Sequence, residues 1–151
     1  MKPLYAHILL PTDASPLSTR GAKAGVKLAK ALRAKVTVVY VAMPYASPLY
    51  GEAAVYYAGP SPREHKRFSE EVAQKAFTPV AVEAKRAGVD CSTLLAVNAK
   101  PWEGILKAAR ARKCDAIVMA SHGRSSLGGL FLGSETQRVL AHSRIPVLVI
   151  R

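Results

Sequence analysis

Short apolar runs alternate with longer, more polar stretches along the chain. The runs lie near residues 6–12, 35–42, 91–97, 115–120 and 146–151, and they are apolar almost throughout, as in VTVVYV at 36–41. Such runs are typical of strands buried on both faces of a parallel sheet. The stretches near 16–33, 62–87, 101–112 and 134–143 are predicted helices. The alternation predicts an α/β fold: an open, doubly wound, Rossmann-like sheet of five parallel strands with helices on both faces.

Start and stop signals support these helices. Ser15 precedes a proline, which suits a cap followed by the first helical turn. Residues 61–64 and 134–137 both match a capping box, and Gly88 is suited to end the second helix. Pro79 lies inside that helix, where a proline should kink it or split it in two.

Residues 43–60 interrupt the alternation of predicted strands and helices. This segment is rich in Pro, Gly and Tyr and is longer than an ordinary connection between a strand and a helix. The segment is consistent with a loop near the ligand-binding edge of the sheet, and equally with a surface that contacts a partner protein. We find no internal repeat or linker, so we expect one domain over residues 1–151 with a variable loop at about 43–60. A chain of this length buries roughly 70% of the surface that it exposes when unfolded, so it needs no disulfide or metal ion to stabilise its core.

The chain is strongly basic, with 22 Lys and Arg against 10 Asp and Glu and a net charge of +12. Basic residues at 23–33 and 107–113 flank apolar residues at helical spacing, which is the pattern of solvated helix faces. They are not accompanied by a helix-turn-helix, zinc-finger or aromatic-stacking signature. Nucleic acid is therefore not the expected partner.

The two cysteines and the lengths of the apolar runs indicate in which cellular compartment the protein is expected. Cys91 and Cys114 lie in or beside apolar runs without metal-ligand spacing, so a reduced thiol is expected for each. The apolar run at 8–10 is too short for a signal-peptide core, and no run approaches the length of a membrane span. We therefore expect a cytoplasmic protein that does not insert into membranes.

Polar residues follow two of the predicted strands. Thr12 and Asp13 follow the first strand, and Ser121 and His122 follow the fourth. Ligands of doubly wound sheets bind at the carboxyl ends of strands, where the winding direction reverses. Asp13 could accept hydrogen bonds from ribose hydroxyls or a base amine, but it or Ser15 could equally cap the first helix.

A loop of small residues leads from the fourth strand to the last predicted helix. It begins at Ala120, and nine residues separate Gly123 from Gly133 and Ser134. Such a loop lets backbone N–H groups approach an anion, and the helix start adds its partial positive charge. The loop indicates a phosphate-bearing ligand, although Ser134 would occupy the same place as a capping residue.

The standard nucleotide and hydrolase motifs are absent. A Walker motif needs a lysine after Gly133, and a dinucleotide site needs GxGxxG after the first strand; neither is present. Residues 123–127 lack the last glycine of a GxSxG elbow. His122 is expected to bond to nearby backbone rather than act as a base, because no partner constellation is visible. The sequence therefore does not predict an enzyme.

Together these segments resemble the universal stress protein family. The resemblance rests on residues 8–15 (ILLPTDAS), the loop 121–134 and the closing run 145–150 (IPVLVI), and it covers essentially the whole chain. It implies a fold like that of the adenine nucleotide alpha hydrolases. It also implies an ATP-binding loop of the pattern Gly, two residues, Gly, nine residues, Gly, then Ser or Thr. Gly123, Gly133 and Ser134 match this pattern, whereas Ala120 replaces its first glycine.

The resemblance also implies roles for individual residues. Asp13 would hold the ribose, Val41 would contact adenine, and the loop would line the sugar and phosphates. Arg124 would add a counter-charge, with a solvated surface arginine as the alternative. Glu135 would face the terminal phosphates if its side chain turned inward. The nucleotide-binding residues implied in this way are Pro11, Thr12, Asp13, Val41, Ala120, Gly123, Arg124, Gly133, Ser134 and Glu135.

The family resemblance implies a regulator or sensor of stress that binds ATP, with or without Mg²⁺, or a related adenine nucleotide and hydrolyses it slowly at most. One alternative is a family member that binds no nucleotide and acts through protein–protein contacts. Another is a nucleotide-dependent α/β enzyme, which the missing catalytic residues disfavour. The last strand, Val147 to Ile150, should lie at a sheet edge and pair with a second copy as a homodimer, unless Arg151 and strand twist protect it.

Overall fold

Strands and helices alternate along the chain in the expected order. The computed structural model describes residues 3–46, 59–122 and 132–151. The expected and observed bounds differ by one residue at most. The elements are β1 (His7–Pro11), α1 (Pro16–Leu32), β2 (Lys35–Ala42), α2 (Pro62–Ala87), β3 (Cys91–Val97), α3 (Pro101–Ala111), β4 (Ala116–Ala120), α4 (Ser134–His142) and β5 (Val147–Ile150).

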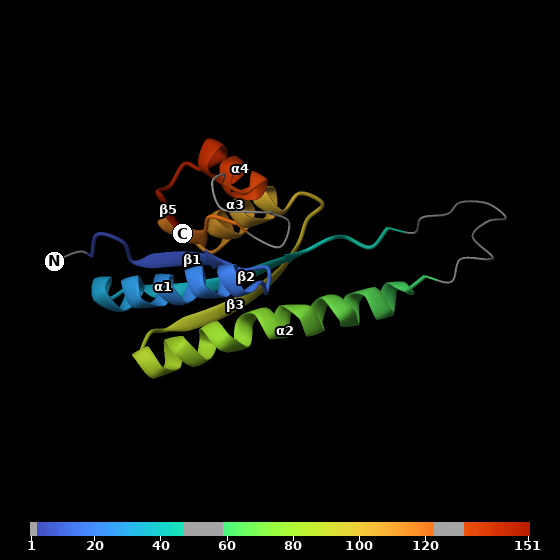
Figure 1. Ribbon diagram of the computed structural model, residues 1–151, viewed down its shortest axis with the longest axis horizontal. Helices are drawn as coiled ribbons and strands as arrows, with labels where there is room; N and C mark the ends of the chain where they lie inside the picture. The colour runs from blue at the N-terminus through green and yellow to red at the C-terminus, as the bar shows by residue number, and fades with distance from the viewer. Residues whose placement is uncertain (1–2, 47–58, 123–131) are drawn as a thin grey trace.

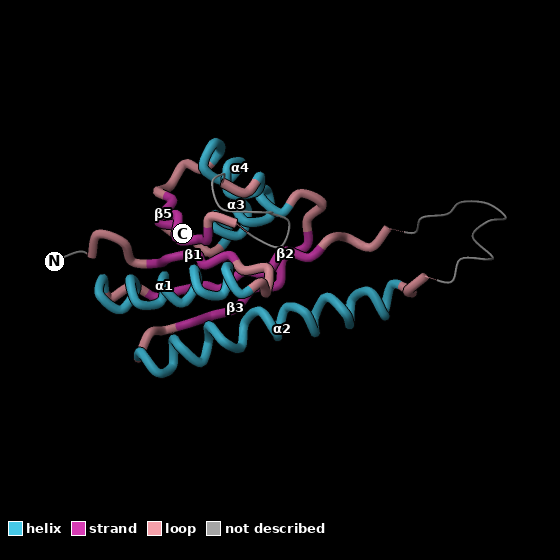
Figure 2. The backbone as a smooth tube through the Cα atoms, viewed as in Figure 1, coloured by secondary structure: helices cyan, strands magenta, loops and turns pink. Residues whose placement is uncertain are grey.

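The strands form one sheet in the order β3-β2-β1-β4-β5. Every neighbouring pair is parallel, so the predicted open five-stranded parallel sheet is confirmed. Helices α1 and α2 cover one face of the sheet and α3 and α4 the other, as Figures 1 and 2 show. The winding direction therefore reverses between β1 and β4, which is where such sheets bind ligands.

Central strand β1 shows why the apolar runs are continuous. Ile8 and Leu10 pack in the core beneath α1 and α2, whereas Leu9, between them, packs in the core beneath α3 and α4. All three side chains are fully buried. Successive side chains of a strand point to opposite faces, so a strand covered on both sides needs apolar residues at every position.

Three predicted helix ends are confirmed. The Ser15 hydroxyl accepts a hydrogen bond from the backbone N–H of Ser18 at the start of α1. Ser61 and Glu64 form a complete capping box at the start of α2. Gly88 ends α2 in the left-handed conformation with φ 71°, where a residue without a side chain is least strained.

One predicted helix start is wrong, and so is one of the two effects expected of Pro79, the splitting of its helix. Residues 134–137 do not form a capping box, because the N-cap of α4 is Gly133 and Ser134 is already the first helical residue. The Gln137 side chain instead donates to the carbonyl oxygen of Leu132. Pro79 does not split α2, which runs unbroken over 26 residues. Phe77 and Val80, on either side of Pro79, are buried against the sheet and hold the helix in place.

The segment at 43–60 is described only at its ends. Residues 47–58, including three of its four tyrosines, lie outside the described residues, so the variable loop stays a prediction. Tyr45, which is described, packs edge-on against the ring of His65 with ring centroids 5.6 Å apart. The imidazole of His65 also contacts the carbonyl oxygen of Met43 through Nε2 at 2.9 Å. These contacts join the chain after β2 to the first turn of α2.

Candidate functional site

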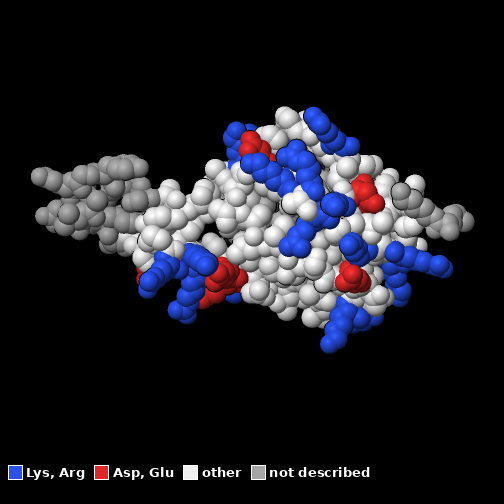
Figure 3. Space-filling view, turned by 180° about the vertical axis from the view of Figure 1, so that it is seen from behind, with Lys and Arg blue, Asp and Glu red and all other residues white. Residues whose placement is uncertain are grey.

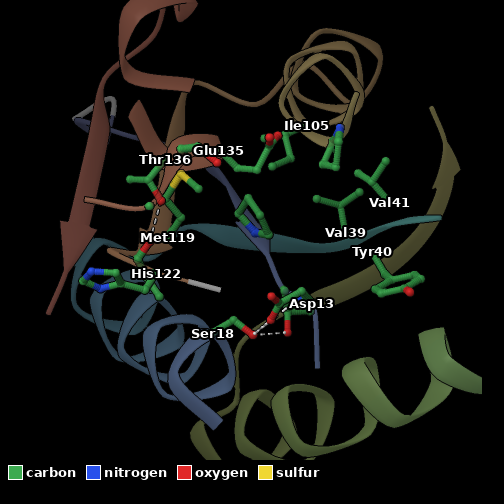
Figure 4. Close-up of a pocket in the computed structure, with 16 residues that line it drawn as sticks. Asp13, Ser18, Val39, Tyr40, Val41, Ile105, Met119, His122, Glu135 and Thr136 are labelled. Atoms are coloured by element: carbon green, nitrogen blue, oxygen red, sulfur yellow. Dashed lines mark hydrogen bonds between the residues drawn. The ribbon is translucent and has the colours of Figure 1, made fainter. Parts of the chain in front are cut away.

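A pocket of about 250 Å³ opens at the carboxyl end of the sheet, at the point where the winding direction reverses. Its wall includes eight of the ten residues implied by the sequence: Pro11, Thr12, Asp13, Val41, Ala120, Gly133, Ser134 and Glu135. The other two, Gly123 and Arg124, lie outside the described residues. Figure 4 shows Asp13 and Ser18 on one side of the pocket and Glu135 and Ile105 on the other.

The turn between β1 and α1 positions the carboxylate of Asp13. Its Oδ1 accepts a 2.6 Å hydrogen bond from the Ser18 hydroxyl and a 3.0 Å bond from the backbone N–H of Ser15. Ala14, between them, is held in the left-handed conformation with φ 66°, a strain that costs of order 1 kcal/mol for a residue with a side chain. Ser15 is therefore the helix cap, and Asp13 orders the turn while lining the pocket.

Apolar side chains form one wall of the pocket. Val39 and Val41 come from the same face of β2, and Ile105 comes from α3. Helix α3 approaches β2 closely because Gly104 has no side chain: a Cβ atom there would lie 2.6 Å from Cγ1 of Val41. The wall is suited to a flat apolar group such as a nucleobase.

The methyl group of Ala120 does not obstruct the pocket. A Cβ atom at Gly21 in α1 would lie 3.0 Å from Cβ of Ala120, so the Ala120 methyl group packs against α1. The Ala120 carbonyl oxygen, in turn, accepts a 3.1 Å hydrogen bond from the Thr136 hydroxyl of α4. The departure from glycine at this position is therefore accommodated by a glycine in the helix that covers it.

The start of α4 presents backbone N–H groups to the pocket. Gly133 is the N-cap and has no side chain with which to cap the helix. Its own N–H donates to the carbonyl oxygen of Ser121 at 2.8 Å, which fixes the entry of the helix beside the end of β4. Gly133 has φ −59°, a conformation open to any residue, so its backbone does not require a glycine. N–H groups of this kind are a ready site for an anion.

Glu135 reaches across from α4 to α3. Its Oε2 accepts a 2.8 Å hydrogen bond from the backbone N–H of Trp102, in the first turn of α3. Its Oε1 accepts a longer bond, 3.4 Å, from Arg138. Helix α3 has no side-chain cap from its own N-cap residue, Lys100, so Glu135 supplies one from another helix. The carboxylate lines the pocket and is held in place by these contacts.

His122 carries an unpartnered polar atom in the pocket wall. Its Nδ1 lies 2.8 Å from the Ser121 hydroxyl, so it bonds to a neighbouring side chain and not to the backbone as expected. Its Nε2 is buried and has no hydrogen-bond partner among the described residues. A buried polar atom without a partner is costly, and a ligand could satisfy it.

Eight further described residues line the pocket and were not among those implied by the sequence: Ser18, Val39, Tyr40, Pro101, Ile105, Met119, His122 and Thr136. Val39 was accessible to prediction, because it lies two positions before Val41 on the same face of a strand. Pro101 and Ile105 have no local signal. They reach the pocket only because α3 packs on β2.

Two chemical features are absent from the described part of the chain. Its His, Cys, Asp and Glu residues do not form a cluster of three or more that could hold a metal ion. None of its helices is long and apolar enough to cross a membrane. Cys91 and Cys114 are both free thiols, and burial raises the pKa of Cys114 to about 11.

The comparisons with known proteins identify the family of the chain. The model of the universal stress protein family matches residues 4–151. The chain belongs to the universal stress protein family. A universal stress protein of Methanocaldococcus jannaschii is 32% identical over 151 residues, which cover 98% of this chain and 83% of the relative.

Solved universal stress proteins share the fold. One, in complex with cAMP, matches with a TM-score of 0.68 and 22% identity over 97% of each chain. Another, from Archaeoglobus fulgidus in complex with dAMP, matches with a TM-score of 0.60 and 18% identity over 98% of this chain and 99% of its own. Both of these solved structures contain an adenine nucleotide.

Proposed function

We propose that this universal stress protein binds an adenine nucleotide, ATP or a related one, and acts as a regulator or sensor that hydrolyses it slowly at most. The observation that carries the proposal is the convergence of three unlike surfaces on one pocket at the switch point of the sheet. These surfaces are the apolar wall at Val41, the carboxylate of Asp13 and the uncapped start of α4.

The residues present fit the parts of such a ligand. The base would lie against Val39, Val41 and Ile105, and the ribose hydroxyls would donate to the Asp13 carboxylate. The phosphate would lie at the N–H groups that follow Gly133, where the helix dipole favours an anion. The relatives solved with cAMP and dAMP support the choice of ligand class.

Among the described residues, the surroundings of the Ser121–His122 pair favour a binding role over catalysis. Ser121 is 2% exposed, so its hydroxyl is closed to a substrate although it bonds to His122. The described pocket wall offers no second group to orient that histidine as a base. A Mg²⁺ ion would enter with the phosphates of ATP. The cytoplasmic location and the single domain over 1–151 stay part of this proposal.

We also propose a homodimer formed through β5. Among the described strands it pairs with β4 alone, so within that part of the chain its other edge has no neighbouring strand. Leu148, in the middle of the strand, is 47% exposed. Pairing of two copies about a two-fold axis would satisfy the backbone groups and cover this side chain.

The nucleotide site is tested by Gly133→Val, measured by calorimetric titration with adenosine, AMP and ATP. A valine side chain at the N-cap would block the approach of a phosphate, so AMP and ATP should bind at least tenfold more weakly while adenosine binds nearly as before. Thr78→Val, on the exposed surface of α2, is the control and should bind as the parent does. A folded Gly133→Val protein with unchanged affinities would show that the site is wrongly placed. If the parent binds none of these ligands, the alternative of a protein-binding family member is favoured.

A further inference from the structure

The described wall of the pocket is acidic although the protein is strongly basic. Asp13 and Glu135 are the carboxylates among the described lining residues, and Lys and Arg are absent from that set. The chain as a whole carries a net charge of +12, and Figure 3 shows Lys and Arg side chains spread over the face of the molecule that is turned away from the viewer in Figure 1. Among the described lining residues the formal charges are therefore those of two carboxylates, and none of these residues is Lys or Arg.

Of these two carboxylates, Glu135 is the one that belongs to α4, the helix whose start would hold the phosphate. It lies two positions after the N-cap Gly133, so its carboxylate and the N–H groups that would hold a phosphate belong to the same helical turn. Its hydrogen bond to the backbone N–H of Trp102 keeps it on the α3 side of the pocket (Figure 4). The Trp102 ring is itself packed on His142 of α4, with centroids 4.5 Å apart, so the two helices hold the carboxylate between them.

We propose that Glu135 is a specificity residue that limits the number of phosphates the pocket accepts, so that adenosine monophosphates bind better than ATP. This inference rests on the proposed function. The start of α4 provides N–H groups for one phosphate, and every further phosphate adds negative charge beside a fixed carboxylate. Arg138 offsets this charge only in part, because its bond to Glu135 is long and its side chain is 55% exposed.

The test is a titration of the unmodified protein and of Glu135→Gln with adenosine, AMP, ADP and ATP. Gln keeps an oxygen that can accept the hydrogen bond from Trp102 and removes only the charge. We expect the unmodified protein to bind AMP at least as tightly as ATP. In Glu135→Gln the affinity for ATP should rise relative to AMP by on the order of tenfold, because a like charge is removed at short range. Adenosine, which has no phosphate, should bind both proteins equally.

Glu103→Gln is the matched control. Glu103 is also a carboxylate in the first turn of α3, but it pairs with Lys100 and is not part of the described pocket wall. This change should leave the ratio of ATP to AMP affinity unchanged. Glu135→Ala is a second neutral variant for the case that Glu135→Gln fails to fold, and it should shift the ratio in the same direction.

The outcomes separate this inference from the proposed function. If the unmodified protein binds ATP more tightly than AMP, and a folded neutral variant has the same ratio, Glu135 does not select ligands although the nucleotide site stands. If adenosine and all three nucleotides fail to bind, the nucleotide site itself is refuted and the inference with it. A ratio that rises in the neutral variants and stays constant in Glu103→Gln supports the proposal.

Discussion

The close approach of α3 to β2 leads to a prediction that links packing to the pocket. In Gly104→Ala the new Cβ would lie 2.6 and 3.0 Å from the two γ-carbons of Val41, and 3.1 Å from Cβ of Asn98. Overpacking of this kind costs about 1–3 kcal/mol. Alanine is also the better helix former, by about 1 kcal/mol. The expected net effect is a loss of up to about 2 kcal/mol in the free energy of unfolding.

A second substitution isolates the clash. Val41→Ala removes both γ-carbons, at a cost of about 1 kcal/mol for a half-buried side chain. In the double variant the two shortest contacts, both with γ-carbons of Val41, are removed, so the helix-forming advantage of alanine is recovered. We therefore expect a favourable coupling energy of at least about 1 kcal/mol between the two substitutions.

Urea denaturation of the parent, the two single variants and the double variant measures this coupling. The four proteins can be compared if the free energy of unfolding falls with urea concentration at the same slope in each. Adenosine titration provides a second measurement: Gly104→Ala should weaken binding, because Val41 is displaced toward the space that the base would occupy. Additive stabilities, within about 0.5 kcal/mol, would refute the packing argument. Unchanged adenosine affinity in a folded Gly104→Ala protein would show that Val41 does not contact the base.

Three further predictions concern other parts of the molecule. Burial and then the charge of Lys35 lower the pKa of His7 below 6.5, so the unfolded chain binds this proton more readily. The free energy of unfolding should therefore decrease as the pH falls below about 6.5 and through the folded-state pKa, and chemical denaturation at several pH values should show a weaker dependence in His7→Gln. Ala120→Gly should cost about 1–2 kcal/mol of stability through lost packing and added backbone freedom, yet leave AMP affinity within about twofold in calorimetry. Leu148→Lys should shift the proposed dimer to monomer in light scattering at micromolar concentration, and an unmodified protein that is already monomeric would exclude the dimer.

The elements of the fold were predictable because each has a local cause. The strands are apolar on both faces, and Ser15, Ser61 and Gly88 mark helix ends through interactions within a few residues. The start of α4 was less accessible. Ser134 and Gln137 have the capping-box residue types, but β4 and the Gly133–Ser121 hydrogen bond place the helix one residue earlier than that motif requires. At this helix start a tertiary hydrogen bond outweighs the local preference for a capping box.

The candidate site was predictable only in part, for a similar reason. Residues at the ends of β1 and β4 meet because parallel strands end at one edge of the sheet, so Thr12, Asp13 and the start of α4 could be expected together. Ile105 joins them through the packing of a helix whose distance from β2 depends on the absence of a side chain at Gly104. The sequence around Ile105 and Gly104 contains no motif, so their roles in the pocket follow only from the packing of α3 on β2.

Ala120, which departs from the family's loop pattern, and Glu135, which directly follows that pattern, differ in consequence because they face different surroundings. The extra methyl group of Ala120 points to α1, where Gly21 leaves room for it, so this departure is a matter of packing. The carboxylate of Glu135, a residue in the first turn of α4, reaches across to α3, where the backbone N–H of Trp102 holds it in the pocket wall. A buried methyl group has no long-range effect, whereas a fixed charge acts on every phosphate near it. We therefore expect Glu135, and not Ala120, to determine which nucleotide the pocket prefers.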